Sequence, residues 1–151
     1  MSERADDACP WTPDRSGDER KRQLLGQPRV VAVVGMSPKR DRPSNYVARY
    51  LKDHGFTIVP VNPTVSAVEG LQAYPDLGSI PENVHVEIVD LFVAPERTGP
   101  VVEQAARIGA KIVWFQPGAE DGTAEARARE LGLEVFSGVC TKAEHSRLFG
   151  E

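Results

Sequence analysis

Short apolar segments and amphipathic segments alternate along most of the chain. The apolar segments are rich in β-branched residues and predict strands that are buried on both faces. They cover residues 29–34, 56–61, 86–92, 111–115 and 133–136. Apolar residues with helical spacing predict helices at residues 44–54, 95–108, 121–131 and 141–149. Strands that alternate with helices indicate an α/β fold whose parallel sheet is covered on both faces.

The order of the strands decides which loops can bind a ligand. We expect a Rossmann-like, doubly wound, parallel five-stranded sheet in a three-layer αβα arrangement, with strand order 3-2-1-4-5 counted along the chain. Ligands bind such sheets beyond the carboxyl ends of the strands. With this order the crevice lies between the strands at residues 29–34 and 111–115. The loops to consider are residues 35–44, 61–64, 92–97, 116–121 and 137–141.

The N-terminal segment differs in composition from the rest of the chain. Residues 1–27 are rich in Asp, Glu, Arg, Ser and Pro. Such a segment buries too little apolar surface to offset the entropy lost on ordering. We therefore expect a mobile tail over residues 1–27, with a short helix at Asp18–Leu25, and one domain over residues 28–151.

A long connection separates the second and third predicted strands. Residues 62–81 contain Pro63, Gly70, Pro75 and Pro81, which interrupt regular structure. We expect a helical turn near residues 65–69, and an apolar segment at residues 77–80 that packs back on the sheet.

Composition and charge exclude several classes of function. The 151 residues are 40% hydrophobic and 26% charged, which is typical of one globular domain. The net charge of −4 gives no overall basic surface for nucleic acid. Cys9 and Cys140 indicate neither a disulfide framework nor a zinc site, so we expect no metal. Because no apolar segment resembles a signal peptide or membrane span, we expect a cytoplasmic protein without membrane binding.

The loop after the first strand has the features of an anion site. Gly35 ends the apolar run, and without a Cβ its backbone can approach a ligand closely. Lys39, Arg40 and Arg42 follow, and Ser44 is placed to cap the next helix. Free N–H groups and the helix dipole favour negative charge there. We expect this loop to hold the phosphates of a nucleotide-like ligand, although three solvated surface cations would give the same pattern.

The fingerprints of common nucleotide sites are absent. The dinucleotide motif needs G-x-G-x-x-G and an acidic residue at the end of the second strand. This loop has only Gly35, and that strand ends in Asn62-Pro63. There is also no G-x-x-x-x-G-K-[ST] sequence. An NAD cofactor and a P-loop NTPase are therefore disfavoured, although an NAD(P)-binding redox protein is kept as an alternative.

Several stretches of the sequence resemble one known family. They read VVAVVGMSPKRDRPSNYVARYLKDHGFTIVPVNP, GLQAYPDLGSIP, VEIVDLFVAPE, AKIVWFQPG and CTKAEHSRL. Residues 30–148 resemble the small stand-alone CoA-binding proteins, which are similar to the nucleotide-binding domain at the start of the succinyl-CoA synthetase alpha subunit. The resemblance implies a Rossmann-like domain with coenzyme A as its cofactor.

The resemblance also implies a place for each part of the ligand. Residues implied near the phosphates are Gly35, Met36, Ser37, Lys39, Arg40, Arg42, Pro43 and Ser44. Residues implied around the adenosine are Val61, Asn62 and Pro63, and Phe92 would form a wall of the crevice. Residues implied along the pantetheine arm are Gln116, Pro117 and Gly118. Many relatives have Phe-Arg where this chain has Phe92-Val93, so that arginine's anion contact is missing unless Arg97 replaces it.

These observations favour a protein that binds coenzyme A or acyl-CoA without catalysis of its own. The alternative is a thioester-processing enzyme that uses Cys140, since a thiol just before a helix has a lowered pKa and could exchange with the CoA thiol. A buried, inert cysteine is the simpler interpretation. The ligand is a small molecule in both cases, and a homodimer or an unidentified protein partner both stay open.

The last predicted helix carries two further expectations. Thr141 and Glu144 have the spacing of a capping box at its start. His145 is expected in a structural hydrogen bond or on the surface, because positions five apart on a helix do not place it beside Cys140.

Overall fold

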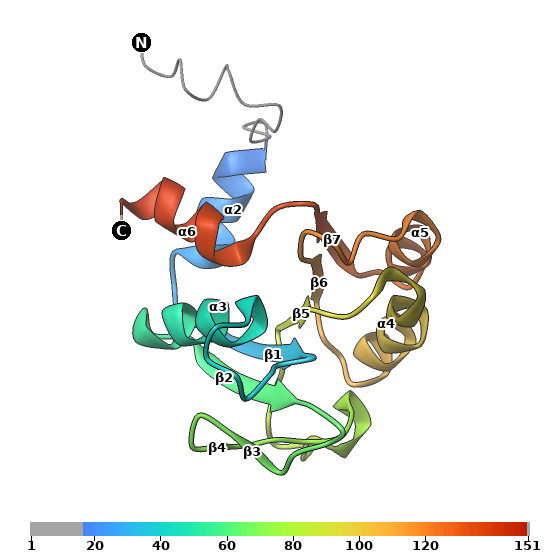
Figure 1. The fold of residues 1–151 in the computed structure, drawn as a ribbon. Coiled ribbons are helices and arrows are strands. Elements are labelled where there is room, and N and C mark those ends of the chain that lie inside the picture. The colour runs from blue at the N-terminus through green and yellow to red at the C-terminus, as the bar shows by residue number, and fades with distance from the viewer. Residues whose placement is uncertain (1–16, 151) are drawn as a thin grey trace.

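The computed structural model describes residues 17–150, which form one five-stranded parallel sheet with helices on both faces (Figure 1). The strands are β1 (Val30–Val34), β2 (Thr57–Val61), β5 (Ile88–Leu91), β6 (Ile112–Phe115) and β7 (Glu134–Ser137). Each overlaps one of the strands predicted from the apolar segments. The expected Rossmann-like α/β class is therefore confirmed.

The order of the strands differs from the expected one. The sheet reads β2-β1-β5-β6-β7, so the third main strand lies in the centre rather than at an edge. The predicted order 3-2-1-4-5 is wrong, and the crevice lies beside β5, which pairs with β1 from Val31↔Ile88 to Val34↔Leu91. All four residues of β5 are buried, as a central strand requires. The edge position belongs to β2, which contains Pro60 and can lack one ladder donor there.

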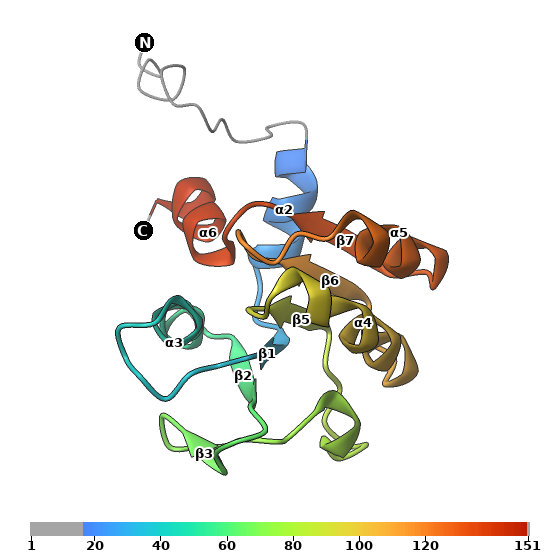
Figure 2. The same ribbon diagram turned by 45° about the vertical axis from the view of Figure 1, so that its right-hand side comes forward.

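The helices complete a three-layer αβα arrangement (Figure 2). One face of the sheet is covered by α2 (Asp18–Leu25), α3 (Pro43–Asp53) and α6 (Thr141–Phe149). The other face is covered by α4 (Thr98–Arg107), which follows the 3₁₀ turn η3 (Pro95–Arg97), and by α5 (Gly122–Glu130). Alternate residues of each strand face the two layers, so Val31 and Val33 join one apolar core and Ala32 and Val34 the other. No helix within residues 17–150 is long and apolar enough to cross a membrane.

The connection from β2 to β5 contains a small hairpin instead of the expected helical turn. Its strands are β3 (Ala67–Val68) and β4 (Leu71–Gln72), which pair antiparallel. Glu69 and Gly70 both have positive φ, at 52° and 75°, which is the backbone that a tight hairpin turn needs. The 3₁₀ turn η2 (Leu77–Ser79) follows, and Leu77 and Ile80 are buried on the sheet as predicted.

Part of the segment expected to be a tail is packed on the domain. The short helix predicted at Asp18–Leu25 forms α2, and its Leu24 and Leu25 are buried in the core with α3. This helix therefore contributes to the packed structure, because its apolar residues meet a core that the local composition does not reveal. Residues 1–16 lie outside the described residues, so the mobile tail expected there stays a prediction.

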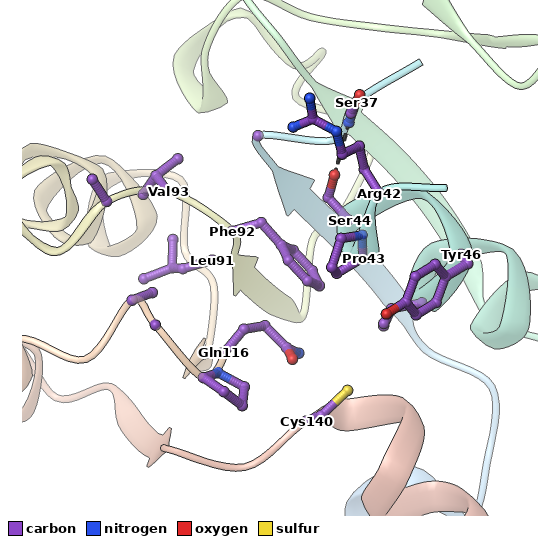
Figure 3. A pocket seen from close by; sticks show the side chains of 16 residues that line it. Ser37, Arg42, Pro43, Ser44, Tyr46, Leu91, Phe92, Val93, Gln116 and Cys140 are labelled. Carbon is purple, nitrogen blue, oxygen red and sulfur yellow. Dashed lines mark hydrogen bonds between the residues drawn. The ribbon is translucent and has the colours of Figure 1, made fainter. Parts of the chain in front are cut away.

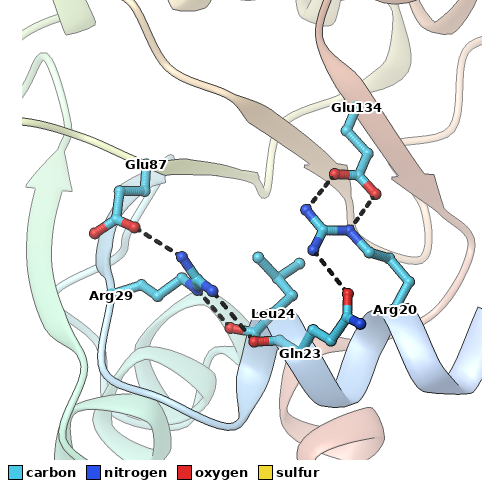
Figure 4. A network of polar contacts seen from close by, with 6 residues as sticks. All are labelled: Arg20, Gln23, Leu24, Arg29, Glu87 and Glu134. Carbon is cyan, nitrogen blue, oxygen red and sulfur yellow. Dashed lines mark hydrogen bonds and ion pairs between the residues drawn. The ribbon is translucent and has the colours of Figure 1, made fainter.

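Arg29 links the C-terminal end of α2 to the amino ends of the strands through hydrogen bonds and an ion pair (Figure 4). Its Nε donates to the Leu24 carbonyl over 2.7 Å and its Nη1 to Glu87 Oε1 over 3.0 Å. Arg20 binds Glu134 at the start of β7 with two hydrogen bonds. A cation at the last carbonyls of a helix also complements its dipole. The sheet edge opposite these contacts, at the carboxyl ends of the strands, is left open for a ligand.

Candidate functional site

A cavity of about 570 Å³ opens at the carboxyl ends of β1, β5 and β6. A volume of this size is within the range of small-molecule sites. The residues that line it are Gly35, Ser37, Arg42, Pro43, Ser44, Tyr46, Val47, Leu91, Phe92, Val93, Ala94, Gln116, Pro117, Gly118, Ala119 and Cys140. Figure 3 shows Arg42, Ser44 and Pro43 on one side, Gln116 and Cys140 on the other, and the Phe92 ring between them.

Many of the site residues expected from the sequence meet in this cavity. They are Gly35, Ser37, Arg42, Pro43, Ser44, Phe92, Gln116, Pro117 and Gly118. Four of the five expected loops contribute, and only residues 61–64 do not. Although the expected strand order is wrong, the first loop and Gln116 still border one space, because β5 between them ends at the same edge of the sheet.

The remaining expected residues do not line the cavity. Met36 and Val61 are buried in the two apolar cores. Arg40 turns to the hairpin, where its Nε lies 3.3 Å from Glu69 Oε2. Lys39 is exposed on the loop. Asn62, which precedes Pro63, instead donates from Nδ2 to the Met36 carbonyl over 2.9 Å and so ties β2 to the first loop.

The first loop is held in one shape by side chains of the following helix. The Ser37 N–H donates to Ser44 Oγ over 2.9 Å, and Asn45 Nδ2 donates to the Ser37 carbonyl over 2.8 Å. The expectation that Ser44 caps the helix is therefore wrong. Its hydroxyl accepts from the loop instead, and the N-cap residue is Arg42. Pro43 has no N–H, and the Ser44 N–H has no hydrogen-bond partner among the described residues. The N-terminus of α3 thus borders the cavity with the Ser44 N–H unpaired within residues 17–150 and no acidic residue in its first turn, which favours an anion.

Gly35 lines the cavity and also has a structural role that the sequence did not indicate. Its φ is +88°, and a Cβ added there would lie 2.6 Å from the Phe92 carbonyl oxygen. Its N–H donates to the Val61 carbonyl over 2.9 Å. Glycine is therefore needed because the chain turns sharply between the ends of β2 and β5, so the close approach is to the protein's own backbone.

The charge of the cavity wall is positive. Among residues 17–150, Arg42 is the one charged side chain that lines it, and none of their carboxylates does. Lys142, in the first turn of α6, places its Nζ 5.3 Å from the centre of the Tyr46 ring, which also lines the cavity. A cation above an aromatic face is attracted to it. This side of the cavity therefore favours an anion.

A buried polar network closes the other side of the cavity. Gln116 Nε2 donates to Asp90 Oδ1 over 2.6 Å and to Thr141 Oγ1 over 2.9 Å, and Thr141 Oγ1 donates to Asp90 Oδ2 over 3.1 Å. Asp90 is fully buried, and this burial raises its pKa to about 7, against the two hydrogen bonds that lower it. The capping box predicted at Thr141 is wrong, because both its side chains bind elsewhere.

The raised pKa of Asp90 predicts a pH-dependent effect of its neutral isostere. Burial raises the pKa of Asp90 from 3.8 to about 7 in the folded state, so its contribution to stability is present at low pH and is lost as the pH rises through about 7. We expect Asp90→Asn to become more stable relative to the wild type between about pH 4 and pH 8. Urea unfolding across this range measures the difference, and parallel curves for both proteins would contradict it.

Cys140 lines the cavity, and its surroundings raise the pKa of its thiol. It is half-buried at the N-cap of α6, and burial raises its pKa despite hydrogen bonds from the helix backbone. The lowered pKa expected for a thiol at a helix start is therefore wrong. His145 is directed away to Tyr50, with 2.8 Å between Nδ1 and the hydroxyl, which confirms the expected structural hydrogen bond.

Several lining residues were not expected from the sequence. They are Tyr46, Val47, Leu91, Val93, Ala94 and Ala119. Val93, Ala94 and Ala119 lie within residues 92–97 and 116–121, two of the loops that the sequence indicates as candidates, although these three residues were not expected individually. Tyr46 and Val47 lie in the first turn of α3, where helical spacing indicates only which residues face the sheet.

Comparison with known proteins identifies close relatives of the whole fold. Residues 29–146 match the model of a family described as CoA binding domain. The protein YneT of Bacillus subtilis is 31% identical over 125 residues, which cover 83% of this chain and 91% of YneT. A hypothetical protein from Pyrococcus horikoshii OT3 is 41% identical, with a TM-score of 0.86 over 94% of this chain and 100% of that one.

A longer enzyme also contains a similar segment. The ADP-forming acetate–CoA ligase I of Archaeoglobus fulgidus is 36% identical over 86 residues, which are 56% of this chain. These residues are only 12% of the ligase, so most of that enzyme has no counterpart in the matched segment. Since the family match extends from the residue before β1 into α6 and includes every loop of the cavity, this chain belongs to the CoA-binding domain family.

Proposed function

We propose that this protein binds coenzyme A or an acyl-CoA in the cavity beside the first loop. The observation that carries the proposal is the pairing of the unpaired Ser44 N–H, at the N-terminus of α3, with Arg42 on a wall to which residues 17–150 contribute no carboxylate. Phosphate groups are the ligand parts that such a wall attracts most strongly. Membership of the CoA-binding domain family supports the same ligand.

The shape of the cavity suggests how such a ligand would lie. Its diphosphate would sit at Ser37 and Ser44, with Arg42 over it, and the adenosine would extend toward Asn62 and Pro63 at the end of β2. The pantetheine arm would cross the Phe92 ring toward Gln116, Pro117 and Gly118. Exposed Lys39 would add attraction at longer range, whereas Glu69 largely offsets the charge of Arg40.

The protein is proposed to bind without catalysing a reaction. The raised pKa of Cys140 disfavours a thiolate nucleophile. Within the described part of the chain, no other thiol and no hydroxyl beside a histidine lines the cavity. An NAD(P) ligand is disfavoured because Asn62, at the end of β2, uses its side chain within the protein rather than offering a carboxylate to a ribose. Ligation by the acetate–CoA ligase belongs to a much longer chain.

Calorimetric titration with coenzyme A tests the proposal, with Arg42→Ala as the main variant. We expect wild-type binding that weakens with salt, and about tenfold or greater loss in Arg42→Ala, because a charge-assisted hydrogen bond to phosphate contributes about 1.5–3 kcal/mol. Arg40→Ala is the matched control on the same loop and should change the affinity less than about threefold, since Arg40 faces Glu69. Absence of binding by the wild type would refute the proposal.

A further inference from the structure

Gln116 presents one polar atom to the cavity in a fixed orientation. Its side chain is almost wholly buried, with 2% of the residue exposed, although it lines the cavity. Both hydrogens of Nε2 are used, one by Asp90 and one by Thr141. Its Oε1 has no hydrogen-bond partner among the described residues. Among those residues, the unpaired side-chain atoms that are fully buried are Glu144 Oε2 and Arg147 Nε, so Gln116 Oε1 keeps some exposed surface. This oxygen is therefore open to the cavity.

The chemistry of its neighbours decides which end of the amide points inward. Above about pH 7 Asp90 is ionised and its carboxylate is an acceptor only, so the amide nitrogen of Gln116 has to face it there. Thr141 accepts from the same nitrogen and donates its own hydrogen to the other carboxylate oxygen. If the amide were reversed, Gln116 Oε1 would face Asp90 Oδ1 at 2.6 Å with no hydrogen between them. The network thus holds Gln116 with its acceptor toward the cavity.

A fixed acceptor selects the kind of ligand group that can lie against it. A phosphate oxygen would be repelled, so the anionic end of a ligand belongs at Arg42 and Ser44 and not here. A ligand group with an N–H would donate a hydrogen bond to Gln116 Oε1. This bond would replace the hydrogen bond that the N–H loses when the ligand leaves water. Figure 3 shows the carboxamide of Gln116 across the Phe92 ring from Arg42, so a ligand held at both places has to extend past that ring.

We propose that Gln116 is a specificity-determining residue that accepts a hydrogen bond from an amide N–H on the arm of the bound ligand. Asp90 and Thr141 are positioning residues that hold the acceptor in place. The inference rests on the proposed function, because the pantetheine arm of coenzyme A supplies such amides at the end remote from the phosphates. It adds that the protein distinguishes a nucleotide with an amide-bearing arm from one without it.

The experiment compares coenzyme A with 3′-phosphoadenosine 5′-diphosphate, which has the same phosphates and no arm. We expect the wild type to bind coenzyme A at least about tenfold more tightly. Gln116→Met keeps the volume and removes the acceptor, so it should weaken coenzyme A about tenfold and leave the armless nucleotide within about twofold. Gln72→Met, an exposed glutamine in β4, is the matched control and should change neither affinity.

The outcomes separate this inference from the proposed function. Equal wild-type affinity for the two ligands, or equal weakening of both in Gln116→Met, would overturn the role of Gln116 while phosphate binding stood. Binding of neither ligand would overturn the proposed function and this inference with it. If Gln116→Met does not fold, the ratio of the two wild-type affinities still tests whether the protein recognises the arm of the ligand.

Thr141→Val tests the positioning role without touching the acceptor. Valine keeps the shape of threonine but removes one of the two acceptors of Gln116 Nε2, so Asp90 alone orients the amide and holds it less firmly. We expect coenzyme A to bind about threefold more weakly, with no change for the armless nucleotide. A purely structural role for Thr141 would lower thermal stability and leave the ratio of the two affinities unchanged, which would contradict the proposal.

Discussion

Replacing Gly35 by alanine is expected to destabilise the protein by at least about 3 kcal/mol. The positive φ of +88° alone costs an L-residue roughly 1–2 kcal/mol. The added methyl group would also lie 2.6 Å from the Phe92 carbonyl oxygen and 3.1 Å from Val93 Cγ1, so the end of β1 or β5 has to move. Thermal unfolding followed by circular dichroism should show a midpoint lower by about 6–12 °C.

Gly118→Ala is the control that separates backbone strain from collision. Gly118 has φ +97°, close to the value at Gly35, but a Cβ there meets no atom within 4 Å. We expect this variant to lose only the roughly 1–2 kcal/mol of the left-handed backbone. If Gly35→Ala and Gly118→Ala had equal effects, the contact between the first loop and the end of β5 would not matter for stability. Movement of that loop should also weaken coenzyme A binding in Gly35→Ala, because Ser37 follows directly.

The sequence predicts the strands better than it predicts their order. Two segments have the composition of interior strands, Val30–Val34 and Ile88–Leu91. Both are strands in the structure, within the ranges expected from the sequence. Composition says little about which interior strand has which neighbour. The connection from β2 to β5 contains no α-helix, only the 3₁₀ turn η2, so the crossover rules that follow from βαβ units do not place β5. Pro60 was the one local signal of order, and it marks the edge strand.

The candidate site was predictable where it depends on local sequence and not where it depends on distant partners. Ser37 and Arg42 belong to the loop between β1 and α3, and they line the cavity as expected. Arg40 lies between them in sequence but pairs with Glu69, a residue of the hairpin that the sequence did not predict. Gln116 was expected on the wall, but its orientation follows from Asp90 on another strand. Patterns along the chain carry no information about such long-range pairs.

A similar limit explains why α2 was assigned to a tail. Its charged residues suggest a solvated segment, yet Lys21 and Asp18 are 4% and 8% exposed in the folded protein. Lys21 Nζ lies 3.0 Å from Glu144 Oε1, and Arg147 binds Asp18 with two hydrogen bonds. The hydrogen bonds from Arg147 lower the pKa of Asp18, which therefore stays ionised. Charge in this helix is complementary to α6, a relation that neither segment shows alone.

Glu144→Gln is expected to destabilise the protein by about 3 kcal/mol, because it removes the buried carboxylate that Lys21 and Arg147 share. Glu144 is fully buried, and its Oε1 receives both Lys21 Nζ at 3.0 Å and Arg147 Nη2 at 2.6 Å. Glutamine has the same shape but no charge, so the buried ion pair between Lys21 and residue 144 is lost. Urea unfolding measures the loss, and limited proteolysis should cut within α2 sooner than in the wild type, since α2 is fastened to α6 through these contacts.

The exposed pair of the same helix supplies the control for this prediction. Arg20 binds Glu134 with side chains that are 45% and 37% exposed, so Glu134→Gln should cost less than about 1 kcal/mol. Both variants remove one carboxylate that contacts α2, and they differ mainly in burial. Equal losses would show that burial does not amplify the interaction. A small loss in Glu144→Gln with unchanged proteolysis would mean that Leu24 and Leu25 hold α2 by apolar packing alone.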